Sequence, residues 1–84
     1  MTVEVKLFAS LRDRFPAKQR GRARLRLGVG ATLTDLLDLL AIAPKQAQRV
    51  LLNGVQVPRS AGVREGRLLA EGDVVAVFPP VAGG

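Results

Sequence analysis

The 84-residue sequence contains no cysteine, histidine, tryptophan or tyrosine. Without cysteine, disulfide bonds, a thiolate nucleophile and thiolate metal ligands are all excluded. Without histidine, the chain lacks the most common general base and metal ligand. Its only serines, Ser10 and Ser60, have no imidazole to activate them. These absences indicate that the chain is not a catalyst by itself. The lack of cysteine is also compatible with a reducing compartment.

Long hydrophobic runs are missing as well. No apolar run approaches the roughly 20 residues that a membrane span needs, and the segment Met1–Lys6 has no apolar signal-peptide core. We therefore expect a soluble, cytoplasmic protein with no membrane association. A chain of 84 residues makes one small domain with a modest core. It has no room for both that core and an enclosed active site.

The charge is unevenly distributed along the chain. The net charge is +6. Residues 1–30 hold eight basic and two acidic residues, whereas residues 31–84 hold five of each. The whole excess of positive charge therefore lies in the first third of the sequence.

Two strands are predicted in this basic part. Apolar and polar residues alternate over 3–9, and they alternate strictly over 22–27. The second pattern places three arginines on the solvent face and three apolar residues inward, namely Ala23, Leu25 and Leu27. The polar segment 10–20 between the strands is predicted to be a loop, with a helical turn at Leu11–Phe15.

A helix is predicted to follow, with Thr32 as its N-cap and Asp35 completing a capping box. Leucines then recur with helical spacing and form one apolar stripe: Leu33, Leu36, Leu37 and Leu40. Pro44 is predicted to end the helix. Asp35 and Asp38 are expected to be solvated surface acids rather than metal ligands, and we predict no metal site.

The second half of the sequence predicts a hairpin and a final strand. Asn53-Gly54 between apolar runs over 49–52 and 55–57 is a strong signal for a type I′ turn. Residues 58–70 are expected to be irregular, and 74–78 forms the last strand. The order of elements predicts an α+β protein of the β-grasp (ubiquitin-like) type. In it one main helix packs across a mixed sheet, and the first and last strands are parallel central neighbours.

The sequence stops at Gly83-Gly84, and these two residues are the strongest functional candidates. Glycine has no Cβ, so a narrow channel in a partner would accept the tail and leave the terminal carbonyl open to attack. The alternative is an ordinary frayed end. We expect residues 1–80 to form the domain and 81–84 to form a flexible tail whose Gly84 carboxylate is the reactive group.

Residues close to this tail are predicted to bind a partner. If Val75 and Val77 face the helix, Phe78 points outward and can anchor a partner. Phe8 would extend the same apolar patch, while Phe15 is expected to pack on the core. The alternative is a shifted register with Phe78 in the core. Two prolines, Pro79 and Pro80, are expected to keep the chain extended where it leaves the last strand. Val81 is expected to contact the same partner.

Three stretches of the sequence carry a family resemblance: Val5–Ala9 with Leu11-Arg12, Gly72–Val74, and Val77–Gly84. With them the sequence resembles the MoaD/ThiS family of ubiquitin-like sulfur carriers. It is most similar to the MoaD branch, the small subunits of molybdopterin synthase. Two features depart from that branch. The stretch 43–48 is short for it, and residues 55–59 are equally typical of the ThiS branch, whose members serve thiamine synthesis.

The resemblance implies a chemical role for the tail. An E1-like adenylyltransferase of the MoeB type would use ATP to convert the Gly84 carboxylate to an acyl-adenylate. A persulfide donor would then replace AMP with sulfur and leave a thiocarboxylate. The tail would enter a MoaE-type large subunit, and the sulfur would pass to a molybdopterin precursor. The chain would be a protein co-substrate that binds no cofactor itself.

Three alternatives stay open at this point. They are a ThiS-type carrier for the thiazole of thiamine, a ubiquitin-like modifier whose Gly84 forms isopeptide bonds, and a basic nucleic-acid-binding module. The last rests on the basic residues of the first third: Arg12, Arg14, Lys18, Arg20, Arg22, Arg24 and Arg26. No aromatic residue is interleaved with them, as single-strand stacking would require. We therefore favour the interpretation that these residues form a solvated strand face. Binding to an acidic patch on a partner protein is a further possibility, between a purely solvated face and a nucleic-acid site.

Overall fold

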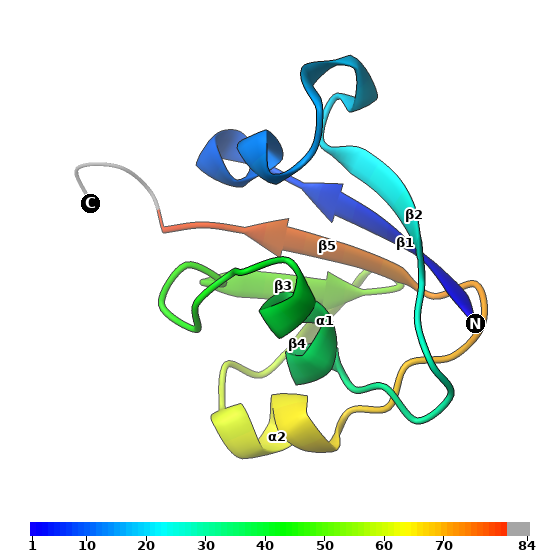
Figure 1. The fold of residues 1–84 in the computed structure, drawn as a ribbon. Helices are drawn as coiled ribbons and strands as arrows, with labels where there is room; N and C mark the ends of the chain where they lie inside the picture. The colour runs from blue at the N-terminus through cyan, green and yellow to red at the C-terminus, as the bar shows by residue number, and fades with distance from the viewer. Residues whose placement is uncertain (81–84) are drawn as a thin grey trace.

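The computed structural model describes residues 1–80, apart from the side chain of Ala61. Its centre is a five-stranded mixed sheet in the order β2-β1-β5-β3-β4, with helix α1 packed across one face (Figure 1). The strands are β1 Thr2–Leu7, β2 Arg22–Arg26, β3 Arg49–Leu52, β4 Val55–Val57 and β5 Val74–Phe78. β1 and β5 are parallel, and the other neighbours are antiparallel. The predicted β-grasp fold is therefore confirmed.

The hydrophobic core lies between the sheet and α1. Every second residue of each central strand points to it, as the two-residue period of a strand requires. The strands contribute Val3, Val5, Leu7, Val50, Leu52, Val75 and Val77, and α1 contributes Leu33, Leu36 and Leu37. Burying one such side chain stabilises the fold by about 1.5–3 kcal/mol. The intervening strand residues form the opposite, outer face of the sheet, and many of them are charged: Glu4, Lys6, Arg22, Arg24 and Arg49.

Helix α1 (Leu33–Leu39) begins as predicted. The Thr32 hydroxyl accepts a hydrogen bond from the Asp35 backbone N–H at 3.2 Å, and the Thr32 N–H donates to the Asp35 carboxylate at 2.9 Å. This reciprocal pair is a capping box, and it satisfies two N–H groups that the helix cannot satisfy internally. Asp35 therefore has a local structural role.

The predicted end of α1 is wrong. The helix ends at Leu39, well before Pro44. Ala41 adopts a left-handed conformation with φ 56°, and its N–H donates to the carbonyl of Asp38 while the Ile42 N–H donates to that of Leu37. These two bonds form a Schellman motif, which usually has glycine at the left-handed position. Alanine in that position left no clear signal in the sequence.

The cap gives a testable prediction. Thr32→Ala removes the hydroxyl acceptor and should lower the free energy of unfolding by about 1 kcal/mol. Thr34→Ala, two residues further along in the first turn of α1 and outside the capping box, is the matched control and should leave stability nearly unchanged. Urea denaturation followed by circular dichroism measures both. Equal losses in the two variants would show that the capping box is not the source of the effect.

The segment between β1 and β2 is more ordered than the predicted loop. It contains two short 3₁₀ helices, η1 (Ala9–Arg14) and η2 (Ala17–Gln19). β1 ends at Leu7, two residues earlier than predicted, because Ala9 turns the chain with φ 51° and begins η1. β2 likewise stops one residue short of Leu27. Phe15 is buried in the core, as predicted.

A second helix, α2 (Ala61–Gly66), lies within the stretch that was predicted to be irregular. Its Arg64 is only 4% exposed, and the Arg64 Nη1 donates to the carbonyl of Ala47 at 2.8 Å. Burial, and secondarily the neighbouring charge of Arg59, lower the pKa of the Arg64 guanidinium. α2 is therefore tied to the loop before β3. Of the helices in residues 1–80, none has the length and apolar character needed to cross a membrane.

Candidate functional site

The last strand, β5, determines which residues surround the exit of the chain. Val75 and Val77 are fully buried, and Phe78 lies on the other face and is partly exposed. This register is fixed from both sides, because Val75 pairs with Val5 of β1 and with Leu52 of β3. The predicted outward position of Phe78 is therefore confirmed, and the alternative with Phe78 in the core is wrong.

Phe8 and Phe78 form a stacked aromatic pair on the outer face. Their ring centroids are 4.2 Å apart and the planes differ by 9°. β1 runs parallel to β5, so the residue that follows β1 meets the last residue of β5, and the Phe8 N–H donates to the Val77 carbonyl at 3.2 Å. Phe8 is still 37% exposed. The sequence predicted both outward positions, but the direct contact between the rings appears only in the structure.

An open groove of about 570 Å³ runs along these rings. It is mainly apolar, with a few polar groups at its rim, and it is lined by Phe8, Ala9, Ser10, Gln48, Arg49, Phe78, Pro79 and Pro80. The groove reaches Pro80, the last described residue. Four of the predicted partner-binding residues thus lie together: Phe8, Phe78, Pro79 and Pro80. The other predicted residues, Val81, Gly83 and Gly84, lie outside the described part of the chain.

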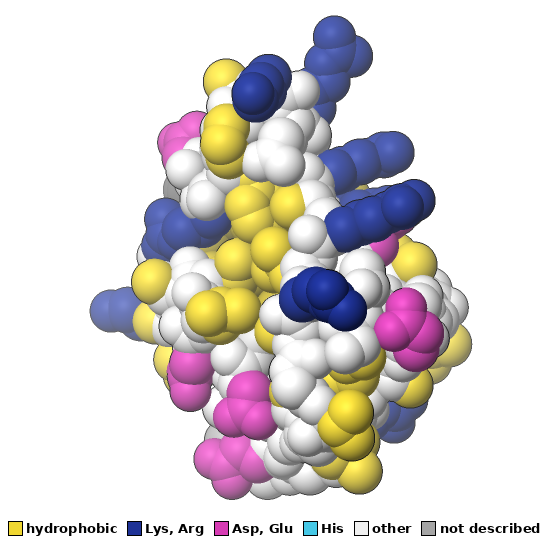
Figure 2. Space-filling view, turned by 45° about the vertical axis from the view of Figure 1, so that its right-hand side comes forward, with side chains coloured by type: hydrophobic (Ala, Val, Ile, Leu, Met, Phe, Trp, Pro, Cys, Tyr) yellow, Lys and Arg dark blue, Asp and Glu magenta, His cyan; other side chains and the backbone are white. Residues whose placement is uncertain are grey.

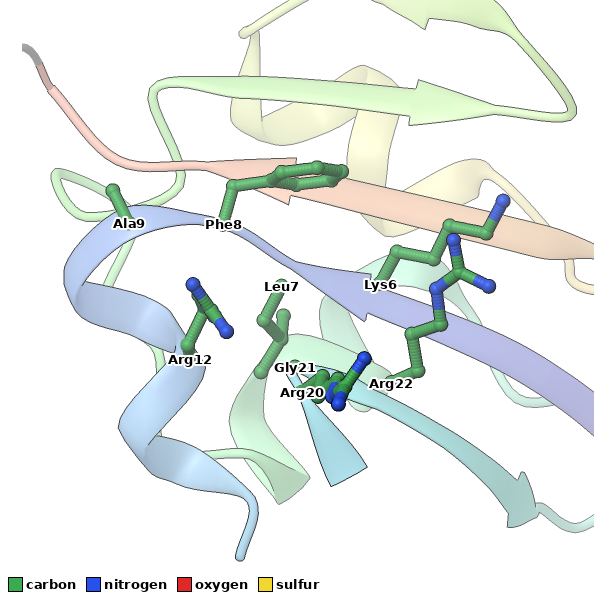
Figure 3. Close-up of a pocket in the computed structure, with 8 residues that line it drawn as sticks. All are labelled: Lys6, Leu7, Phe8, Ala9, Arg12, Arg20, Gly21 and Arg22. Carbon is green, nitrogen blue, oxygen red and sulfur yellow. The ribbon is translucent and has the colours of Figure 1, made fainter. Parts of the chain in front are cut away.

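A second hollow of about 280 Å³ adjoins the groove and shares Phe8 and Ala9 with it. Figure 3 shows cationic side chains around it from three parts of the chain. Lys6 comes from β1, Arg12 comes from η1, and Arg20 and Arg22 stand on either side of Gly21 at the start of β2. The sequence predicted a basic strand face but could not place Lys6 and Arg12 beside it.

The chemistry of this region is suited to binding. The groove offers stacked aromatic and proline surfaces, which form apolar contacts with little loss of side-chain entropy. The Ser10 hydroxyl, the Gln48 amide and the Arg49 guanidinium supply hydrogen-bonding groups at its rim. Within residues 1–80, no group of three or more acidic residues is placed to hold a metal ion. The arrangement can dock a partner next to the exit of the chain.

Comparison with known families identifies the class of protein. The model of the ThiS family matches residues 5–84, almost the whole chain. The chain therefore belongs to the ThiS family, whose ubiquitin-like β-grasp fold the sheet and α1 display. A search of curated proteins found no match.

Solved structures with the same fold cover the whole domain. Small archaeal modifier protein 1 of Haloferax volcanii is 30% identical, with full coverage of both chains and a TM-score of 0.68. A candidate molybdopterin converting factor subunit 1 from Pyrococcus furiosus is 26% identical, with 96% of this chain and 99% of that chain covered and a TM-score of 0.66. A complex of subunits 1 and 2 of the molybdopterin-converting factor of Helicobacter pylori matches at 22% identity, full coverage of both chains and a TM-score of 0.60.

Proposed function

We propose that this protein is a sulfur carrier whose Gly84 carboxylate is adenylated and then converted to a thiocarboxylate. A carboxylate is a poor electrophile, and adenylation with ATP supplies AMP as a leaving group. The terminal sulfur of a persulfide donor displaces AMP and forms an acyl disulfide, and a thiol on the donor or the activating enzyme then breaks the S–S bond, which leaves the Gly84 thiocarboxylate and a disulfide. The family match supports this proposal, because it extends through Gly84. The chain has neither histidine nor cysteine, so the activating enzyme and the sulfur donor supply the acid–base and thiol chemistry. The carrier itself is a protein co-substrate.

The observation that carries the proposal is the aromatic pair beside the exit of β5. Phe8 and Phe78 form a rigid apolar surface next to Pro79 and Pro80. Exposed, stacked rings at an open groove are typical of protein-docking sites. A partner that packs on these rings would find the tail within reach of its own active site. The domain thus serves to position the tail.

Within this role, we favour the small subunit of a molybdopterin synthase. The likeness to a candidate molybdopterin converting factor subunit 1 over nearly its whole length supports this choice. The partners would then be a MoeB-type adenylyltransferase, a persulfide donor and a MoaE-type large subunit. A ThiS-type carrier for thiazole synthesis uses the same activation chemistry. It is distinguished by the acceptor, a thiazole synthase in place of the large subunit.

A second candidate is a ubiquitin-like protein modifier. The observation that favours it is the 30% identity with small archaeal modifier protein 1 over both whole chains. In that role a lysine amine, rather than sulfur, would receive the activated Gly84 carbonyl. Slower-migrating covalent adducts in cell extract, absent when Gly84 is removed, would identify the modifier.

The test of the sulfur-carrier proposal is the intact mass of the chain after incubation with its host's E1-like enzyme, ATP and a persulfide donor. We expect a gain equal to the exchange of one oxygen for sulfur, and no gain without ATP. An unchanged mass, with an enzyme that is active on another carrier, would contradict the proposal.

A further prediction concerns docking. Phe78→Ala removes one ring of the pair and should weaken binding to the activating enzyme by roughly thirtyfold, the size of an interface hot spot. Val29→Ala is the matched control, because Val29 is 96% exposed and lies in the turn after β2, outside the groove. Calorimetric titration gives the affinities, and urea denaturation shows how far the fold itself is weakened. An unchanged affinity of the Phe78 variant would remove the ring from the docking surface.

A further inference from the structure

The outer face of the sheet carries its charge asymmetrically along the strands. At the end of β1, beside Phe8, four cations line one hollow and no carboxylate does: Lys6, Arg12, Arg20 and Arg22. At the start of β1, a different hollow is lined by Glu4 and Glu71 with Arg24 as the single cation. The same two strands thus have a positive end at the groove and a mixed end away from it.

The cations at the positive end have few internal partners. Among the described residues, the only ion pair joins the Lys6 ammonium to the Glu4 carboxylate at 3.8 Å. Asp13 lines a neighbouring hollow together with Arg12 and Arg20, beyond ion-pair distance of either. Three arginines around one hollow are therefore without a carboxylate partner in the part of the chain that the structure describes.

This clustering is unfavourable for the isolated domain. Lys6 and Arg22 are directly opposite in the antiparallel register of β1 and β2, and Figure 3 shows their charged ends turned toward the same space. Like charges directly opposite each other on one sheet face destabilise the pairing. Figure 2 shows Lys and Arg side chains projecting outward from one flank of the molecule, where another protein can reach them. Carboxylates from such a protein would remove the repulsion.

We propose that the enzyme that activates the tail presents an acidic surface to the hollow formed by Lys6, Arg12, Arg20 and Arg22. This inference rests on the proposed function, because it assigns the charge of the partner at the proposed docking surface. The hollow and the apolar groove share Phe8 and Ala9, so one partner covers both. Charge complementarity then steers the approach, and it orients the domain so that the rings and the tail arrive together.

The placement of charge favours an acidic protein over a nucleic acid. A phosphate backbone needs a continuous cationic track. Along β1 and β2 that track is broken, because Glu4 is paired in register with Arg24 and Glu71 lines the same hollow. The one ring at the cationic hollow, Phe8, is stacked on Phe78. Four cations around one hollow therefore match a compact acidic patch on a protein better than they match the extended phosphate backbone of a nucleic acid.

Two double variants that remove the same charge test the proposal. Arg20→Gln/Arg22→Gln removes two of the four cations at the positive end, and Arg24→Gln/Arg26→Gln removes two cations from the other half of β2. Association rates with the host's E1-like enzyme are measured by stopped flow at about 50 mM and about 500 mM NaCl, where screening is weak and strong. We expect the first variant to associate roughly tenfold more slowly at low salt, the second to change less than about twofold, and the difference to vanish at high salt.

Equal rates for the two variants, or a rate independent of salt, would overturn the proposal. Total transfer RNA serves as the polyanion probe. RNA binding that persists near physiological salt and is weakened equally by both variants would overturn it in favour of a nucleic-acid surface. The mass measurement separates the two failures. If wild-type chain gains sulfur while both variants associate alike, the sulfur-carrier function stands and the acidic contact does not. If wild-type chain neither binds nor gains sulfur, both are overturned.

Discussion

Deleting Gly83 and Gly84 should abolish sulfur incorporation and leave the thermal midpoint of the domain unchanged. The core and the sheet lie within residues 1–80, so the deletion removes the proposed reactive carboxylate and no described contact. The new terminus, Ala82, would carry a Cβ, and it would also be two residues short of the activating enzyme's active site. Intact mass after the activation reaction measures the first effect, and differential scanning calorimetry measures the second.

Two controls sharpen this experiment. One alanine appended after Gly84 keeps every native residue but moves the carboxylate, and we expect it to be inactive too. Ala82→Ser keeps both glycines and the terminus, and we expect it to remain active. A large fall in thermal stability on deletion would contradict the prediction, because the tail would then be part of the fold.

The second large effect is expected at Gly21. This residue has φ +77°, and a Cβ there would lie 2.4 Å from the carbonyl oxygen of Leu7. The Gly21 carbonyl also accepts a 2.7 Å hydrogen bond from the Leu7 N–H, so these two backbone segments cannot move apart freely. We expect Gly21→Ala to lower the free energy of unfolding by roughly 3–5 kcal/mol, because backbone strain and a backbone clash combine. Urea denaturation provides the measurement.

Gly30→Ala separates the two causes. Gly30 has φ +94°, but a Cβ there meets nothing within 4 Å. Its alanine variant should lose only about 1–2 kcal/mol, the cost of the left-handed conformation alone. Losses of equal size at the two positions would show that the contact with Leu7 is unimportant. Gly21 lies between Arg20 and Arg22 in the lining of the cationic hollow. A larger loss at Gly21 than at Gly30 would therefore show that the backbone that carries these two arginines is held in place by its contact with Leu7.

The strands and the start of α1 were predictable because their signals are local. The apolar run over 74–78 predicted β5, and the two-residue period of a strand placed Phe78 outward on the condition that Val75 and Val77 face the helix. The pair Thr32 and Asp35 identified the first turn of α1, since a capping box involves residues only three apart. At Asn53-Gly54 both residues have the positive φ that the hairpin turn requires. In each case the residues that determine the local geometry are only a few positions apart in the sequence.

The errors occurred where tertiary contacts override local preference. α2 contains Gly62 and Gly66, which are poor helix formers. It is nevertheless helical, since the buried Arg64 side chain donates to the Ala47 carbonyl of a distant loop. Similarly, α1 ends through a left-handed alanine at Ala41 rather than at the proline further on. No pattern within either segment reports these contacts.

The candidate site was predictable only in part, for the same reason. Alternation placed Phe8 and Phe78 outward, but their contact depends on the parallel register of β1 with β5. Likewise, Lys6 meets Arg22 through the antiparallel register of β1 with β2, and Arg12 lines the same hollow because η1 follows directly after β1. The aromatic and proline residues of the site were therefore named from sequence, whereas Lys6, Gln48 and Arg49 were found only in the structure, and the grouping of these residues required the fold.

The parallel pairing of β1 with β5 has a consequence for synthesis on the ribosome. The docking surface needs one ring from the eighth residue and one from the seventy-eighth. β5 is inserted between β1 and β3, so a nascent or truncated chain that lacks it has neither a complete sheet nor the paired rings. Contacts between distant parts of a chain form late, since they close the longest loops. An activating enzyme that recognises the paired rings would thus ignore incomplete chains, and recognition would itself act as a check that synthesis and folding are finished.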